Sequence, residues 1–209
     1  MSKPEYRVMQ EDDIEAVLSF WGNIEGVHLH SNGGDTMYLV SVYFDEKTNK
    51  IFNRWIHLIA ERTGNDFMTL NNVPPHMTLS SIEARSVDVL TEPIEMLRGK
   101  LNKGDVSFVS TGQLMPYVFF AMPVLNDYLQ DLSHQVYESV KNIPKTSVSR
   151  YYQPGSWLPH VTLGKTLSKE QMRTAFAIMQ EQFQPFTATV TEIGLAKVNP
   201  HEDVVRFEL

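Results

Sequence analysis

Apolar residues follow two spacings along this chain, one typical of strands and the other typical of helices. The run at 38–44 is apolar almost throughout, which predicts a buried strand. The segment 46–62 then repeats its apolar residues Trp55, Leu58 and Ile59 at the spacing of a helix. Farther along, the same two patterns predict helices at 87–101, 125–141 and 168–183, and strands at 106–114, 117–124, 188–198 and 204–209.

Two copies of a four-residue phrase begin two further strand-like runs. His76-Met77-Thr78-Leu79 and His160-Val161-Thr162-Leu163 both read His-x-Thr-Leu, and each follows a proline. Because successive side chains of a strand point to opposite faces, the His and Thr of each copy project together while the apolar pair turns toward a core. Two such strands, placed face to face, would put two imidazoles and two hydroxyls around one cleft. Phosphodiester chemistry without a metal needs that set: a base, an acid and donors to the phosphate oxygens.

The predicted elements recur in the same order in both halves of the chain. The motif histidines are 84 residues apart, and the opening strands, at Tyr38 and Tyr117, are 79 apart. We therefore expect one α+β domain at 37–209, built from repeats at 37–115 and 116–209. Its two pseudo-symmetric lobes would place antiparallel sheets along a central cleft. Residues 1–36 form an N-terminal extension with a helical pattern at 12–20, which either caps the cleft or packs on a lobe.

Charge and composition restrict the partner. The net charge is −7, and no two of the 18 Lys and Arg residues are adjacent. Proteins that bind a long nucleic-acid duplex usually carry clusters of Lys and Arg, because neutralising the phosphate charges supplies much of the binding affinity. A small nucleotide or an RNA terminus is therefore the expected partner. The chain has no cysteine and no apolar run of about 18 residues, so we expect no thiol chemistry and no membrane span. A monomeric, cytoplasmic protein is the expectation.

The paired motifs resemble the signature of the two-histidine (2H) phosphoesterase superfamily, which includes 2′-5′ RNA ligase-like and cyclic phosphodiesterase-like proteins. The resemblance extends over residues 38–209. It implies a bilobal fold and metal-independent cleavage or transfer at 2′,3′-cyclic or 2′-5′ phosphodiester bonds, with no cofactor. By the same resemblance, the catalytic residues are His76, Thr78, His160 and Thr162.

The chemistry of these residue types agrees with that implication. An unperturbed histidine titrates near pH ~6.5, so a neutral and a protonated imidazole can coexist near neutrality. The neutral one would take a proton from water or a ribose hydroxyl, and the protonated one would give a proton to the departing oxygen. Thr78 and Thr162 would donate hydrogen bonds to non-bridging phosphate oxygens. The pseudo-symmetry leaves open which histidine is the acid. Neither motif supplies the ligand set of a catalytic metal, so no metal site is predicted.

Lys165 is a candidate substrate-binding residue beside the second motif. It follows His160 by five residues, an odd number that turns it to the opposite face of a regular strand. A bulge at Gly164 would restore the facing, since glycine within a strand often marks one. The alternative is a solvated lysine at the end of the strand.

An aromatic loop leads into the second motif and offers further candidates. Tyr151, Tyr152 or Trp157 would stack on a base, as aromatic side chains do with unpaired nucleotides. The alternative for Trp157 is packing beneath the loop. Tyr117, at the start of the second half, lines either the cleft or the core.

Two other functions remain open. One is RNA end ligation, the reverse of 2′-5′ cleavage. The other is a non-catalytic nucleotide- or RNA-binding module that keeps the cleft, although such a module has no need of both imidazoles. Turnover of 2′,3′-cyclic nucleotides and short 2′-5′ oligonucleotides separates these alternatives from hydrolysis.

Overall fold

The computed structural model describes residues 36–198 and 201–209, and the predicted N-terminal helix at 12–20 lies outside them. Every other strand and helix expected from the apolar pattern is present, with ends shifted by a few residues. In chain order the elements are β1 (Thr36–Phe44), α2 (Glu46–Thr63), α3 (Phe67–Leu70), β2 (Met77–Ala84), α4 (Asp88–Glu95), β3 (Gly104–Leu114), β4 (Val118–Pro123), α5 (Asp127–Val140), β5 (Ser147–Val148), the 3₁₀ helix η1 (Arg150–Tyr152), β6 (Val161–Gly164), α6 (Lys169–Gln182), β7 (Phe186–Lys197) and β8 (Glu202–Glu208).

One prediction was wrong at its end. The helix expected at 87–101 stops at Glu95, and residues 96–100 form turns. Gly99 adopts a positive φ of 73°, a conformation that glycine reaches without steric cost. The short elements α3, β5 and η1 were not predicted, because segments of two to four residues carry no periodic pattern.

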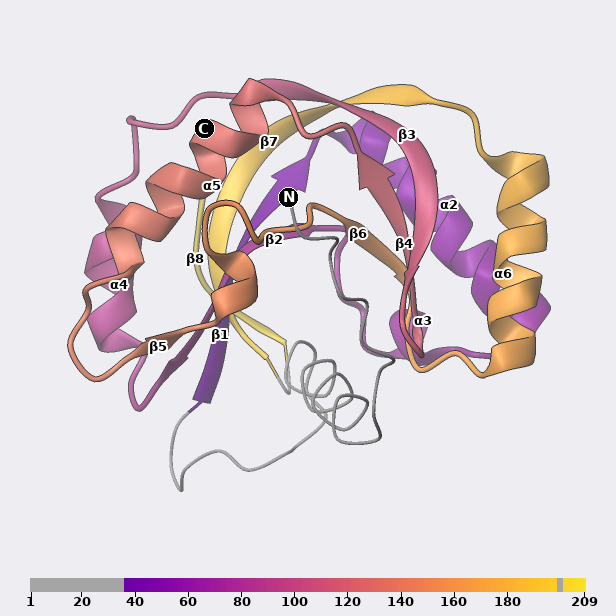
Figure 1. Ribbon diagram of the computed structural model, residues 1–209, viewed down its shortest axis with the longest axis horizontal. Helices are drawn as coiled ribbons and strands as arrows, with labels where there is room; N and C mark the ends of the chain where they lie inside the picture. Colours follow the sequence, from indigo (N-terminus) through magenta and orange to yellow (C-terminus); the bar gives the residue numbers. More distant parts are fainter. Residues whose placement is uncertain (1–35, 199–200) are drawn as a thin grey trace, which may run out of the picture.

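The strands form one curved antiparallel sheet, so the predicted α+β class is confirmed. Its order is β5-β2-β1-β7-β3-β4-β6, and β8 also pairs with β7. Figure 1 shows this sheet as an arch with helices outside both of its flanks. A single continuous sheet thus takes the place of two separate ones, because the long strand β7 pairs with β1 and with β3. No helix among the described residues is long and apolar enough to cross a membrane.

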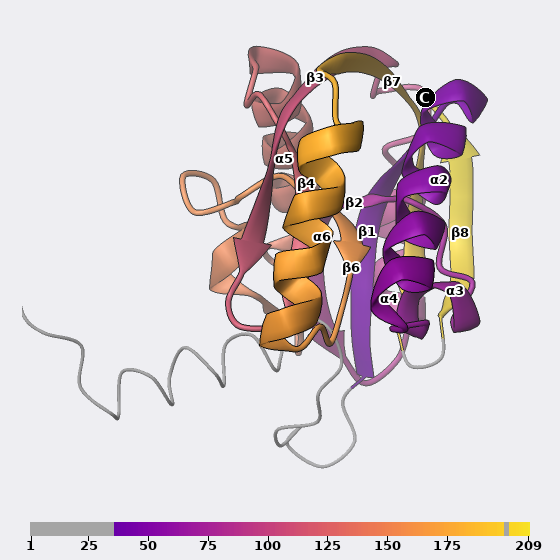
Figure 2. The same cartoon turned by 90° about the vertical axis from the view of Figure 1, so that its right-hand side faces the viewer.

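The two halves of the sequence are interleaved in space. Helix α2, from the first half, packs against α6 and β6 of the second half. Conversely, α5 from the second half packs against β2 and α4 of the first. Figure 2 shows α2 and α6 running alongside each other on one flank. Each flank of the sheet is therefore covered by one helix from each half.

The core fixes the two motif strands from behind. Met77, Leu79, Val161 and Leu163 are all completely buried, as the alternation within each motif predicted. Burying a side chain of this size contributes about 1.5–3 kcal/mol. The apolar residues that alternate with the His and Thr therefore anchor both motif strands in the core.

Candidate active site

Both motif strands carry a bulge at the same position. Ser41 pairs with Thr78 and Val40 with Ser80, so Leu79 has no partner on β1. On the other flank of the arch, Phe120 pairs with Thr162 and Phe119 with Gly164, which leaves Leu163 without a partner on β4. The bulge predicted at Gly164 thus lies one residue earlier, at the leucine of the motif. Its presence in both motifs is further evidence of their equivalence.

The two motif histidines are held by the same local hydrogen bond. His76 Nδ1 lies 2.8 Å from the carbonyl oxygen of Pro74, and His160 Nδ1 lies 2.9 Å from that of Leu158. A carbonyl oxygen can only accept, so Nδ1 carries the proton in each ring. That tautomer leaves Nε2 with its lone pair in both imidazoles, ready to accept or return a proton. Both rings are partly buried.

The motif hydroxyls have different neighbours. The Thr78 hydroxyl lies 3.3 Å from the Ser41 hydroxyl across the β1–β2 pair, within hydrogen-bond distance. Thr162 is 9% exposed and pairs with Phe120, whose ring centroid lies 5.2 Å from that of His160. Ser41 and Phe120 occupy equivalent places in the two halves, so the site is polar at the first motif and aromatic at the second.

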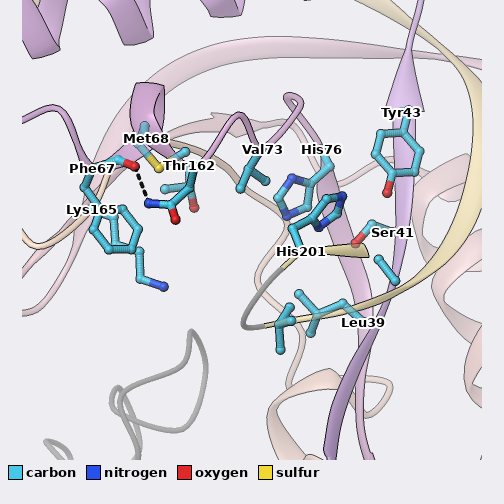
Figure 3. A pocket seen from close by; sticks show the side chains of 13 residues that line it. Leu39, Ser41, Tyr43, Phe67, Met68, Val73, His76, Thr162, Lys165 and His201 are labelled. Carbon is cyan, nitrogen blue, oxygen red and sulfur yellow. Dashed lines mark hydrogen bonds between the residues drawn. The ribbon is translucent and has the colours of Figure 1, made fainter. Parts of the chain in front are cut away.

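A cavity of about 170 Å³ brings residues of both motifs together. His76 from the first motif and Thr162 from the second both line it, with Ser41 (Figure 3). His160 and Thr78 are not among its lining residues. His160 is two residues before Thr162, with no bulge between them, so alternation places both on the same side of the strand. The apolar part of the wall consists of Leu39, Phe67, Met68, Val73, Ala196 and Val198.

Lys165 lines this cavity together with Thr162. The bulge in β6 accounts for this, because an extra residue in a strand resets the alternation that follows it. The ammonium group lies 5.2 Å from the ring centroid of Phe67, a cation–π contact that holds the side chain over helix α3. The lysine is therefore placed at the cavity, and its contact with substrate stays a prediction.

The aromatic loop has a mainly structural arrangement. The Trp157 indole N–H donates to the Thr78 carbonyl oxygen at 2.9 Å, and its ring packs on the core. Tyr152 is 4% exposed, whereas Tyr151 lies under the Arg150 guanidinium, 4.7 Å from its ring centroid. Tyr117, in the turn before β4, is 55% exposed. None of these four aromatic residues lines the cavity, so their contact with a base stays a prediction.

Sequence reasoning did not find a polar cluster beside the first motif. The Tyr43 side chain is 1% exposed and hydrogen-bonded to the carboxylate of Asp203. Burial, and then the charge of Asp203, raises the pKa of the Tyr43 hydroxyl far above its ordinary value, so the hydroxyl keeps its proton. The Arg206 guanidinium lies 3.7 Å from the ring centroid of Tyr43 and 2.5 Å from the Glu192 carboxylate.

This polar cluster reaches the cavity through His201. The His201 ring lies in the turn between β7 and β8 and lines the cavity with Tyr43 and His76. Its Nε2 is 3.3 Å from Asp203 Oδ1. The sequence gives no signal for this arrangement, because it depends on the pairing of β7 with β8 and of β7 with β1. Within residues 36–198 and 201–209, no three His, Cys, Asp or Glu side chains gather as metal ligands would.

Comparisons with solved structures agree with this architecture. Escherichia coli LigT complexed with 3′-AMP matches with a TM-score of 0.57 at 16% identity, covering 84% of this chain and 98% of that one. LigT complexed with NADP⁺ has a TM-score of 0.56 at 15% identity, with coverages of 85% and 99%. A structure described as a phosphoesterase has a TM-score of 0.55 at 15% identity, with coverages of 83% and 98%. At such low identities these likenesses show the fold alone.

The sequence comparison identifies the family. No curated protein matches the chain. A family model described as the 2′-5′ RNA ligase superfamily, however, matches residues 52–202, which include both His-x-Thr-Leu motifs and most of the chain. The resemblance to the 2H phosphoesterases is thereby confirmed. With two equivalent motif strands, two imidazoles held in one tautomer and a match of this extent, the chain belongs to the 2′-5′ RNA ligase superfamily.

Proposed function

We propose that this protein hydrolyses 2′,3′-cyclic or 2′-5′ phosphodiester bonds in small nucleotides or at RNA ends, without a metal. Membership of the superfamily places it in the phosphodiesterase- and ligase-like class. The observation that carries the finer proposal is the matched pair of hydrogen bonds from His76 and His160 to Pro74 and Leu158. Both rings thereby present the same nitrogen, Nε2, for proton transfer.

The two imidazoles divide the proton transfers between them. The neutral imidazole takes a proton from water through Nε2 as the water oxygen forms its bond to phosphorus. The other imidazole, protonated on both nitrogens, gives its Nε2 proton to the ribose oxygen as the P–O bond breaks. For a 2′,3′-cyclic substrate the product is a nucleoside monophosphate with one free hydroxyl. The protonation states are then exchanged, and proton exchange with solvent restores the starting state.

The phosphate oxygens need donors while charge builds on them. Thr162 lines the cavity with Lys165, and Thr78 lies on the first motif strand beside Ser41. We assign the two threonine hydroxyls to the non-bridging oxygens, where preorganised donors are most effective in catalysis. The Lys165 ammonium adds a positive charge on the side of the second motif.

The dimensions and charge of the site support a small substrate. The cavity of about 170 Å³ has a largely apolar wall, with Lys165 as its one lysine or arginine among the described residues. The chain as a whole carries a net charge of −7, which disfavours an extended duplex. LigT, which shares the fold, has been solved with 3′-AMP. One or two nucleotides therefore fit this site better than a long strand.

Turnover in excess EDTA tests the proposal. We expect the protein to convert nucleoside 2′,3′-cyclic phosphates or 2′-5′ dinucleotides to monophosphates at a rate that EDTA does not change, because the imidazoles supply both proton transfers. Chromatography of the products measures this. A rate that falls on chelation and returns with a divalent cation would contradict the metal-free mechanism. Joined RNA ends without hydrolysis would indicate a ligase, and binding without product would indicate a non-catalytic module.

A further inference from the structure

A third imidazole lies in the same cavity as His76. His201 belongs to neither motif, and β8, which follows it, has no counterpart in the repeat that the sequence predicted. Its side chain is 21% exposed. Figure 3 shows the rings of His201 and His76 in the same part of the cavity, near Ser41, with Lys165 toward the opposite side.

Asp203 lies beside this imidazole. Nε2 of His201 is buried and lies 3.3 Å from Asp203 Oδ1, and it has no hydrogen-bond partner among the described residues. Asp203 is itself fixed by the Tyr43 hydroxyl and lies 3.6 Å from the Arg206 guanidinium. The Tyr43 ring is also a neighbour of His76, with ring centroids 6.3 Å apart. One polar cluster thus reaches both imidazoles.

The polar cluster beside His201 is mainly anionic. The cluster contains two carboxylates, Asp203 and Glu192, and one guanidinium, Arg206. With Nε2 turned toward Asp203, Nδ1 is the ring nitrogen left for a ligand. A donor next to His76, opposite the Lys165 ammonium, suits a phosphate oxygen.

We infer that His201 is a third substrate-contacting imidazole of this site. From its place beside Asp203, it donates a hydrogen bond from Nδ1 to a phosphate oxygen of the nucleotide bound against His76. The inference rests on the proposed function for the position of that phosphate. Because the bond forms in substrate and product alike, His201 contributes to phosphate binding more than to the chemical step.

Binding to His201→Gln measures this contribution. Glutamine keeps a polar side chain of similar reach but has no ring N–H at the place of Nδ1. His134→Gln, on the exposed face of α5, is the matched control. We expect calorimetric titration with adenosine 2′-monophosphate to show roughly 10-fold or more weaker binding to His201→Gln, since hydrogen bonds to charged groups are the stronger ones. Adenosine, which lacks the phosphate, should bind both variants as it binds the wild type.

Three results would overturn the inference. The first is an unchanged affinity of His201→Gln for the monophosphate, and the second is an equal loss of affinity for the monophosphate and for adenosine. The third is a wild type that does not bind the monophosphate. An equal loss would mean that His201 shapes the cavity without contacting phosphate. Thermal unfolding of each variant shows whether it is folded. A second variant, Asp203→Asn, should weaken monophosphate binding in the same direction. Failure of the proposed function is distinguishable, because it appears as absent turnover in a wild type that still binds the monophosphate.

Discussion

Replacing either motif histidine with alanine is expected to reduce kcat/KM for a 2′,3′-cyclic nucleotide by about 10²–10⁴-fold, the usual contribution of general acid–base catalysis. His76→Ala removes one proton carrier and His160→Ala removes the other. Because one imidazole cannot serve both transfers at once, each single variant should lose most of the activity. The double variant should be little worse than either, since groups that act as a unit are not additive.

The protein should remain folded in both variants. Each ring is only partly buried, and its Nδ1 bond is local, to the carbonyl two residues earlier. His57→Ala is a matched control, because His57 makes the same kind of bond to the Asn53 carbonyl on the exposed face of α2. Activity near the wild-type value in folded His76→Ala and His160→Ala would refute the assigned active site.

Trp157→Phe is expected to destabilise the protein by about 0.5–1.5 kcal/mol, the net contribution of a typical hydrogen bond, because the bond that it removes is partly buried. The indole N–H of Trp157 bonds the Thr78 carbonyl, so it links the loop before the second motif to the strand of the first. Phenylalanine keeps an aromatic ring but has no N–H. Trp157→Ala should cost more, because the packing of the ring on the core is lost as well. Denaturant unfolding measures both values.

The same variant separates packing from base stacking. If Trp157 served mainly to stack on a base, Trp157→Phe would keep its stability and most of its affinity, since phenylalanine also stacks. Tyr117→Phe is the control, because this side chain is 55% exposed and its change should stay within about 0.5 kcal/mol. An unaltered unfolding free energy for Trp157→Phe, together with a raised KM for Trp157→Ala, would contradict the packing role.

The sequence was most informative where candidate catalytic residues lie in a segment whose apolar residues recur at a regular spacing. The two motifs could be predicted as strand residues because an alternation of period two needs only neighbouring positions, and Met77 and Leu163 are buried as expected. The helices at 46–62 and 168–183 could be predicted equally well, since the spacing of apolar residues and the capping of a helix both depend on residues close together in the sequence. Ser168 and Gln171 form a capping box at the start of α6.

Features that depend on pairing between strands distant in the sequence could not be predicted. His201 reaches the cavity because β7 pairs with β1 on one edge and with β8 on the other, which no local pattern reveals. The interleaving of α2 with α6 depends likewise on packing between distant segments. Lys165 is an intermediate case: glycine suggested a bulge, and the structure places that bulge at Leu163, one residue before Gly164.

Both motif histidines are expected to contact the same phosphate, and a crystal structure with a bound nucleoside 2′-monophosphate would show whether they do. We expect the phosphate oxygens within hydrogen-bond distance of Nε2 of His76 and Nε2 of His160, the nitrogens left by their Nδ1 bonds to Pro74 and Leu158. A phosphate bound away from these two rings, or contacting only one of them while the other faces solvent, would contradict the account.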